Sequence, residues 1–192
     1  MNHYLALDQA SRRIGWAIGN ANMLAPLSGV FELPSAGARH GVMLTAARDW
    51  LDATVKCYHV TKVGFESPFC GPNPATFALV NKLIGIIELV CHDHNIHCVE
   101  TMIDNWRNRF IEVCRAPKSI IPPGTSRGKA GTIRRAWLKE QSMIACAHRR
   151  WDVKTHDEAE ACGILDYLLA IDDEAYRNRT ARAPEMALEG AA

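Results

Sequence analysis

Apolar runs alternate with turn-forming residues over the first part of the chain. The runs span residues 3–7, 14–19 and 27–33, and the segments between them are rich in Gln, Ser, Arg, Asn and Pro. Short apolar runs bounded by such residues are typical of β-strands joined by tight connections. We therefore predict that the chain opens with three antiparallel strands that follow one another along a sheet.

Helical spacing replaces this pattern from residue 38 onwards. Apolar residues recur every three or four positions over residues 38–58, and residues 75–92 form a longer, mostly apolar segment. Both segments are typical of helices. Two short apolar runs, at residues 60–65 and 96–100, predict two more strands. Because strands and helices alternate here, we expect an α/β fold.

The remainder of the chain is predicted to be helical around one irregular segment. Residues 105–131 contain several Pro and Gly residues and are expected to form a short helix followed by a loop. Helices are expected over residues 132–150 and 156–170, and a flexible acidic and polar tail over residues 172–192. With 192 residues, 48% of them hydrophobic, residues 1–171 are expected to form a single domain.

The cysteines and the lengths of the apolar runs bear on the cellular compartment of the protein. The seven cysteines are scattered and include no Cys-x-x-Cys pair, which argues against a disulfide framework and against a cysteine zinc site. No apolar run is expected to reach the roughly 20 residues that a membrane span requires, and no secretory leader is expected. We therefore expect a soluble, cytoplasmic protein without a membrane partner.

Charge is distributed unevenly although the net charge is only +1. Residues 101–154 contain twelve Lys or Arg against four Asp or Glu, whereas residues 155–192 contain three against nine. A basic segment followed by an acidic one is consistent with a surface for a polyanion beside a carboxylate-rich helix. A pair of salt-bridged surface helices would have the same composition.

Four carboxylates stand at the ends of predicted strands or at the start of a predicted helix. Asp8 and Glu66 each end an apolar run, and Asp157 and Glu160 are three residues apart in the first turn of the last helix. Singly, each has a structural explanation as a turn opener or a helix-start acid. Together, carboxylates from separate elements are what a pair of Mg²⁺ ions requires. We expect these four residues to converge on a metal site.

Three motifs resemble those of RuvC-type Holliday-junction resolvases, which have the ribonuclease H-like fold. LALDQASRRIGWAI is similar to the first two strands of that family, VGFESPF to its central strand, and HDEAEACGILDYLL to its last helix. The resemblance implies a mixed central sheet of three antiparallel and then two parallel strands, flanked by helices. It also implies that Asp8, Glu66, Asp157 and Glu160 are catalytic ligands of two Mg²⁺ ions, which Mn²⁺ can replace. Two departures from the family are Ala10, where Gly is usual, and Glu160, where Asp is usual.

The same resemblance implies a set of contacts to DNA and to a second subunit. Phe69 stands where the family has an aromatic residue that inserts between bases at a junction, although a buried loop anchor would have the same character. Phosphate contacts are expected from Lys118, Arg127, Lys129, Arg134 and Arg135. Either Lys118 or Lys129 would stabilise charge at the scissile phosphate. Helix 73–92 corresponds to the family's dimer helix, so a homodimer is expected.

The expected function is therefore metal-dependent cleavage of four-way or otherwise branched DNA, leaving a 5′-phosphate as in the family. One alternative is a nuclease of the same fold that acts on another substrate, such as RNA in a hybrid. Another is a junction-binding protein that does not cleave. Trp106, with Arg107 and Arg109, is either a DNA clamp or, more in keeping with its helical apolar spacing, a core residue.

Overall fold

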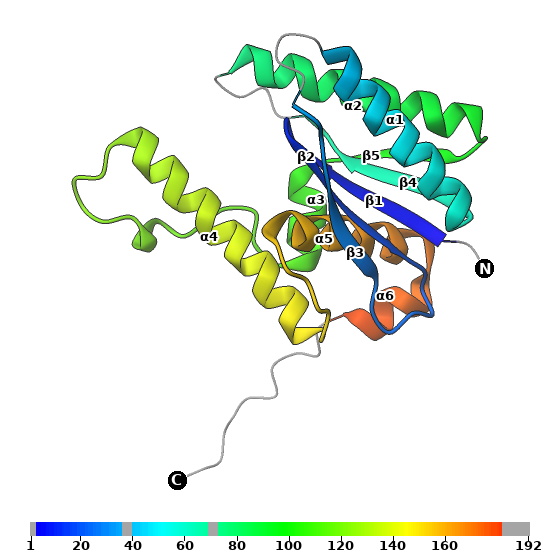
Figure 1. The fold of residues 1–192 in the computed structure, drawn as a ribbon. Helices are drawn as coiled ribbons and strands as arrows, with labels where there is room; N and C mark the ends of the chain where they lie inside the picture. The colour runs from blue at the N-terminus through cyan, green and yellow to red at the C-terminus, as the bar shows by residue number, and fades with distance from the viewer. Residues whose placement is uncertain (1–2, 36–39, 69–72, 182–192) are drawn as a thin grey trace.

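Five strands form a mixed sheet in the computed structural model, which describes residues 3–35, 40–68 and 73–181 (Figure 1). Strands β1 (His3–Gln9), β2 (Arg13–Gly19) and β3 (Leu27–Glu32) are antiparallel neighbours. Strand β4 (Val60–Glu66) runs parallel to β1, and β5 (His97–Thr101) runs parallel to β4. The strand order is β3-β2-β1-β4-β5. This confirms the expected mixed sheet of three antiparallel and then two parallel strands.

Helices cover both faces of this sheet. On one face lie α1 (His40–Cys57) and α2 (Pro74–Asp93). On the other lie α3 (Ile103–Phe110), α5 (His156–Asp172) and α6 (Glu174–Thr180). Helix α4 (Arg127–His148) packs against α5, and its N-terminal half extends away from the sheet (Figure 1). A short 3₁₀ helix, η1 (Lys118–Ile120), lies in the connection that precedes α4.

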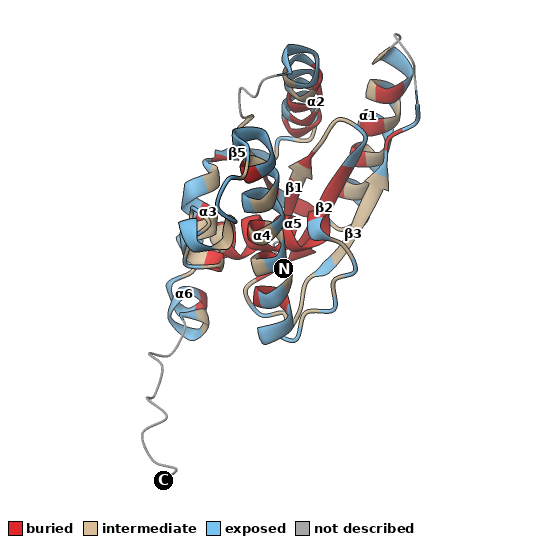
Figure 2. Cartoon of the chain, turned by 90° about the vertical axis from the view of Figure 1, so that its left-hand side faces the viewer, coloured by how far each residue is buried: buried red, intermediate tan, exposed pale blue. Residues whose placement is uncertain are grey.

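Alternate residues of the central strand serve two separate cores. Leu5 and Leu7 of β1 pack with α1 and α2, whereas Ala6 faces the core built around α5. This follows from the two-residue repeat of a strand. Helix α5 is buried on all sides, as the red ribbon at the centre of Figure 2 shows. Polar groups on α5 are therefore held in a largely dry environment.

Two of the expected boundaries are wrong. Helix α4 begins at Arg127 rather than at residue 132, because Gly128 and Gly131 are tolerated within it and Ala130 is buried against the core. Residues 174–180, expected to belong to a flexible tail, form α6 instead. Its Tyr176 is 4% exposed, and the Tyr176 hydroxyl donates a hydrogen bond of 2.9 Å to the fully buried Asp166.

The expectation about apolar length is also wrong for α2. This helix has 20 residues and a mean hydropathy of 1.6, so by length and composition alone it could cross a membrane. Only 33% of its most apolar 18-residue stretch is buried, but one side packs into the core through Leu83, Ile87 and Cys91. Core helices of soluble proteins have the same character, so this is weak support for a membrane span. The opposite side of α2 includes Leu89, which is 48% exposed.

Candidate metal centre

The alternation along β1 directs Asp8 toward α5. Asp8 shares a strand face with Ala6, which belongs to the α5 core, and it pairs across the sheet with Gly15 of β2. The start of α5 lies directly on Gly15. A Cβ atom at this position would lie 2.3 Å from the backbone oxygen of Asp157. The missing side chain at Gly15 thus allows the first turn of α5 to approach Asp8.

The N-terminus of α5 presents two carboxylates on one side. Thr155 caps the helix, and its hydroxyl accepts a hydrogen bond of 3.2 Å from the backbone N–H of Glu158. Asp157 and Glu160 follow within the first turns, three residues apart, and are only 4% and 5% exposed. The partial positive charge at a helix N-terminus stabilises such anions. Local sequence therefore places both side chains on one side of the helix start.

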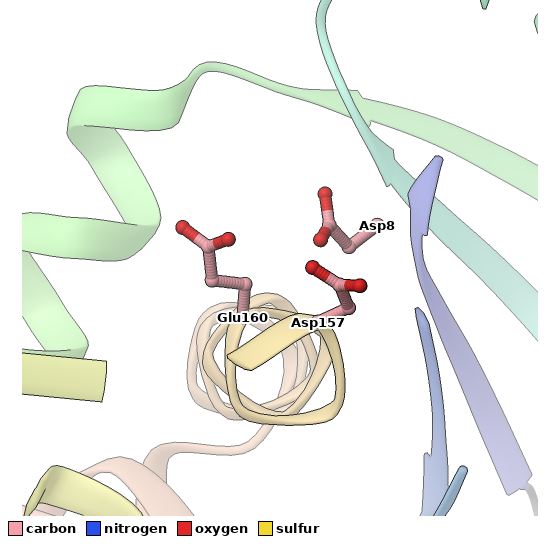
Figure 3. A group of neighbouring side chains, drawn as sticks. All are labelled: Asp8, Asp157 and Glu160. Carbon is pink, nitrogen blue, oxygen red and sulfur yellow. The ribbon is translucent and has the colours of Figure 1, made fainter. Parts of the chain in front are cut away.

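Asp8, Asp157 and Glu160 form one cluster. Each offers a carboxylate oxygen, and these oxygens all lie within 4.8 Å of one another. Figure 3 shows the two helix carboxylates projecting from α5 toward Asp8 at the end of β1. Burial, followed by repulsion from Glu160 and Glu66, raises the pKa of Asp8 well above its usual value. Clustered carboxylate oxygens are the donors that Mg²⁺ and Mn²⁺ prefer, so these three residues fit a divalent cation.

Glu66 lies beside this cluster rather than within it. It ends β4, the strand next to β1, and its Oε2 accepts a hydrogen bond of 2.9 Å from the Trp106 indole N–H. Burial raises the pKa of Glu66 to about 7, with a further contribution from Glu160, against the opposing effects of Trp106 and Arg107. The structure therefore brings three of the four expected ligands together, and Trp106 holds the fourth. The catalytic and metal-binding roles of all four stay predictions.

Three cations neutralise the cluster. Lys139 Nζ lies 3.0 Å from Asp157 Oδ1 and 3.1 Å from Glu160 Oε2. Arg107 pairs with Glu160 at 2.8 Å, and Arg13 pairs with Asp157. Although burial opposes it, the carboxylates of Glu160 and Asp157 raise the pKa of Lys139. A cation is thus already favoured at this position.

Sequence reasoning did not single out Lys139 or Arg13, and it considered Arg107 only as part of a DNA clamp with Trp106 and Arg109. Lys139 follows the buried Leu138, at the edge of the apolar face of α4. A lysine at such an edge can bend its flexible stem toward a buried acid. The position of Lys139 on the helix was therefore the sequence feature that could have indicated its contact with the carboxylates. Arg13 follows the predicted polar turn and begins β2, and the packing of α5 on Gly15 of the same strand brings it near Asp157.

The residues expected to contact DNA lie away from these carboxylates. Lys118 is in η1, and the four arginine and lysine residues on α4 are exposed: Arg127, Lys129, Arg134 and Arg135. Within the described ranges, none of the five forms an ion pair with the cluster. Phe69 lies outside the described residues. Trp106 is fully buried and belongs to the α5 core, so a role as an exposed DNA clamp is wrong.

Metal affinity is expected to increase as the pH rises. A divalent cation requires deprotonated ligands, whereas the raised pKa of Asp8 and that of Glu66, about 7, favour their protonated forms. By the same linkage, the metal-free protein should lose stability as the pH rises from about 5 to about 8, because the folded state binds these protons more tightly than the unfolded state does.

Calorimetric titration with Mg²⁺ and thermal unfolding with and without Mg²⁺, each at several pH values, would measure both effects. The increase in Tm caused by Mg²⁺ should grow with pH. The Glu66→Gln variant should show a weaker pH dependence, because one of the two raised carboxyl groups is gone. An Mg²⁺ affinity that is constant or falls over this range would contradict the assignment.

Comparison with known proteins identifies the fold. No family model matches the sequence, and no curated protein matches it. Among solved structures, RuvC of Thermus thermophilus aligns with a TM-score of 0.64 at 10% identity, covering 92% of this chain and 95% of that one. RuvC of the same organism in complex with a Holliday junction substrate aligns with a TM-score of 0.62 at 8% identity, covering 93% and 96%.

The yeast mitochondrial Holliday junction resolvase Ydc2 aligns with a TM-score of 0.58 at 10% identity, covering 93% of this chain and 83% of that one. Identities this low establish the arrangement of elements and no more. Nevertheless, the alignments extend over nearly the whole chain. The chain therefore has the ribonuclease H-like fold in the form found in RuvC-type resolvases, as its sequence motifs predicted.

Proposed function

We propose that this chain is a metal-dependent endonuclease that resolves four-way or branched DNA junctions. The observation that carries the proposal is the convergence of Asp8, Asp157 and Glu160 at the place where β1 meets the start of α5. Structural likeness to two RuvC structures, one of them bound to a Holliday junction, supports this substrate over others.

The proposed cleavage assigns separate tasks to the residues of the site. Asp8, Asp157 and Glu160 would hold one Mg²⁺, and Glu66 with Asp8 would hold a second. Bound metal would lower the pKa of an attacking water and stabilise the leaving oxygen of the phosphodiester. Lys139, whose ammonium group lies beside Asp157 and Glu160, is better placed than Lys118 or Lys129 to pair with an oxygen of the scissile phosphate.

Cleavage of matched substrates tests the proposal. We expect the chain, with Mg²⁺, to cut a four-way junction at least about 100-fold faster than a linear duplex of the same sequence, a difference of about 2.7 kcal/mol in transition-state binding. An RNA–DNA hybrid should be cut no faster than the duplex. Equal rates on the junction and the duplex would refute junction specificity, whereas preferential cutting of the hybrid would support a ribonuclease of the same fold.

One observation favours a second function, junction binding without cleavage. Lys139, Arg107 and Arg13 already satisfy Asp157 and Glu160, as in a structural ion-pair network. If this network were the purpose of the cluster, Mg²⁺ would not bind and no strand would be cut. Junction binding by the wild-type chain, together with no cleavage and no change in Tm with Mg²⁺ or Mn²⁺, would identify this alternative.

The proposed homodimer uses the exposed side of α2, and substituting Leu89 tests it. Leu89→Glu should raise the dimer dissociation constant at least about tenfold, because a charge would be buried at an apolar contact. Leu27→Glu on β3 is the matched control, since both leucines are 48% exposed. Light scattering over a range of concentrations would measure both variants. A dimer that both substitutions weaken equally, or that neither weakens, would exclude α2 as the interface.

A further inference from the structure

A cavity of about 510 Å³ lies at the C-terminal end of α4, away from the carboxylate cluster. Its walls come from the end of α3, the end of α4, α6 and the connection between β2 and β3. Its volume is within the range of sites for small organic molecules. Nothing in the proposed cleavage uses this cavity, and its lining has a distinct chemistry.

Aromatic rings and a guanidinium group form one wall. The rings of Phe110 and Trp151 stack with centroids 6.0 Å apart. The Arg149 guanidinium lies 4.4 Å from the centre of the Phe110 ring and 5.7 Å from that of Trp151. Planar guanidinium and indole groups are the surfaces on which unpaired bases stack. Leu24, which is 97% exposed, and Ile144, which is 39% exposed, add apolar surface among the lining residues.

Arginine side chains contribute positive charge to this wall, and Arg149 also interacts electrostatically with the buried Asp166. Arg149 Nη1 donates to the backbone oxygen of Ala145, and Arg179 Nη2 donates to that of Ala21. Neither arginine forms an ion pair with a carboxylate among the residues that the structure describes. The lining also includes His148, whereas Glu112 is the one carboxylate among its described members. The cavity is thus suited to a ligand that joins an anionic group to a flat apolar ring, as a nucleotide does.

Helix α4 connects the cavity to the basic surface that was expected to contact DNA. Arg127, Arg134, Gln141 and His148 are spaced seven residues apart, so they share one side of the helix. Gln141 and His148 line the cavity. Lys139, two positions before Gln141, points about 200° away around the helix, toward the carboxylate cluster. The helix therefore presents one polar side to the cleavage site and another to the cavity.

We propose that this cavity is a second DNA site that accepts an unpaired nucleotide of a strand that is not cut. The inference rests on the proposed function, because it assumes a branched DNA whose strands diverge on either side of α4. The base would stack on Trp151 and Arg149, and the phosphate would pair with Arg179. A wall of stacked rings and a guanidinium group favours a nucleotide over an acidic peptide, because a peptide backbone has no flat ring to stack on it.

Two substitutions on one helix provide the main test. Arg179 lines the cavity, whereas Arg177 of the same helix does not and is also exposed. In metal-free buffer, the anisotropy of a labelled single-stranded thymidine oligonucleotide would report binding. We expect Arg179→Gln to weaken binding at least about fivefold, and Arg177→Gln to change it by less than about twofold. Equal losses in the two variants would reduce the effect to surface charge and overturn the proposal.

Stacking is tested separately through Trp151. The contribution of Trp151 to the fluorescence is the difference between the wild type and the Trp151→Phe variant. The oligonucleotide should quench this contribution, whereas an abasic strand of the same length should not. Equal binding of the abasic strand would overturn the stacking role. Stronger binding of an acidic peptide of equal charge would assign the cavity to a protein partner instead. Thermal unfolding of each variant verifies that it is folded.

Failure of this inference is distinguishable from failure of the proposed function. If the chain cuts junctions but Arg177→Gln and Arg179→Gln behave alike, the cavity proposal fails alone. If the chain binds the oligonucleotide as described but cuts no junction, the proposed cleavage fails while the cavity is retained as a binding site for unpaired DNA.

Discussion

Replacing Asp8 with Asn should reduce Mg²⁺-dependent cleavage of a four-way junction at least about 10³-fold, because the substitution removes the carboxylate that joins the two helix acids. The amide keeps the size of the side chain but is a much weaker ligand for a hard cation. Glu160 and Glu66 both raise the pKa of Asp8, so Asp8 interacts electrostatically with both of these expected ligands. No other single substitution should affect as many of the expected ligands.

Nicking of an end-labelled junction by the wild-type and Asp8→Asn chains would measure the loss. Junction affinity should change by less than about threefold, because the five basic residues expected to contact phosphates lie away from Asp8 and its negative charge opposes DNA. Asp152→Asn, at an exposed position in the connection before α5, is the matched control and should cut normally. Undiminished nicking by Asp8→Asn would exclude this residue from metal binding.

The stability of the Asp8→Asn variant without metal is an independent test of whether a loss of cleavage is caused by unfolding. A buried carboxyl group with a raised pKa is destabilising once it is ionised. Asp8→Asn should therefore be at least as stable as the wild type near pH 8 without metal, and should gain less Tm from Mg²⁺. A variant that is inactive because it is unfolded would not show this pattern.

Replacing Gly15 with Ala should disrupt both the fold around α5 and the metal centre. The added Cβ would meet the backbone oxygen of Asp157 at 2.3 Å, and a backbone atom cannot move aside as the end of a flexible side chain can. Overpacking of this kind typically destabilises a protein by about 1–3 kcal/mol. The first turn of α5 would shift away from β2, and Asp157 would move away from Asp8 with it.

Misplacement of catalytic groups by about 1 Å can reduce a rate about 100-fold, so Gly15→Ala should lose that much cleavage even where it remains folded. The control is Gly131→Ala, since a Cβ there meets nothing within 4 Å. That change should stabilise α4 by about 0.5–1 kcal/mol. Urea unfolding and junction nicking would measure both variants. A Gly15→Ala chain with normal stability and normal cleavage would contradict the close approach of α5 to β2.

The secondary structure was largely predictable because it produces a local periodicity in the sequence. All five strands and helices α1, α2 and α5 lie within a few residues of their predicted ranges, because repeats of two and of about 3.6 residues are properties of neighbouring positions. Errors arose where tertiary contacts override such signals. Helix α6 is short and polar, and it is held by the buried hydrogen bond from Tyr176 to Asp166, which is itself paired with Arg109. Helix α4 contains two glycines, Gly128 and Gly131, which led to the prediction of a loop over these residues.

The candidate site divides in the same way. That Asp8 and Glu66 stand at strand ends, and that Asp157 and Glu160 share one side of a helix start, follows from local features of the sequence: strand length, helix capping and three-residue spacing. Which of these carboxylates meet depends on tertiary packing. Gly15 allows α5 to approach β1, Trp106 keeps Glu66 to one side, and Lys139, Arg107 and Arg13 reach the cluster from separate elements. Those outcomes depend on which surfaces pack together, and packing between distant segments leaves no periodic signal in a single sequence.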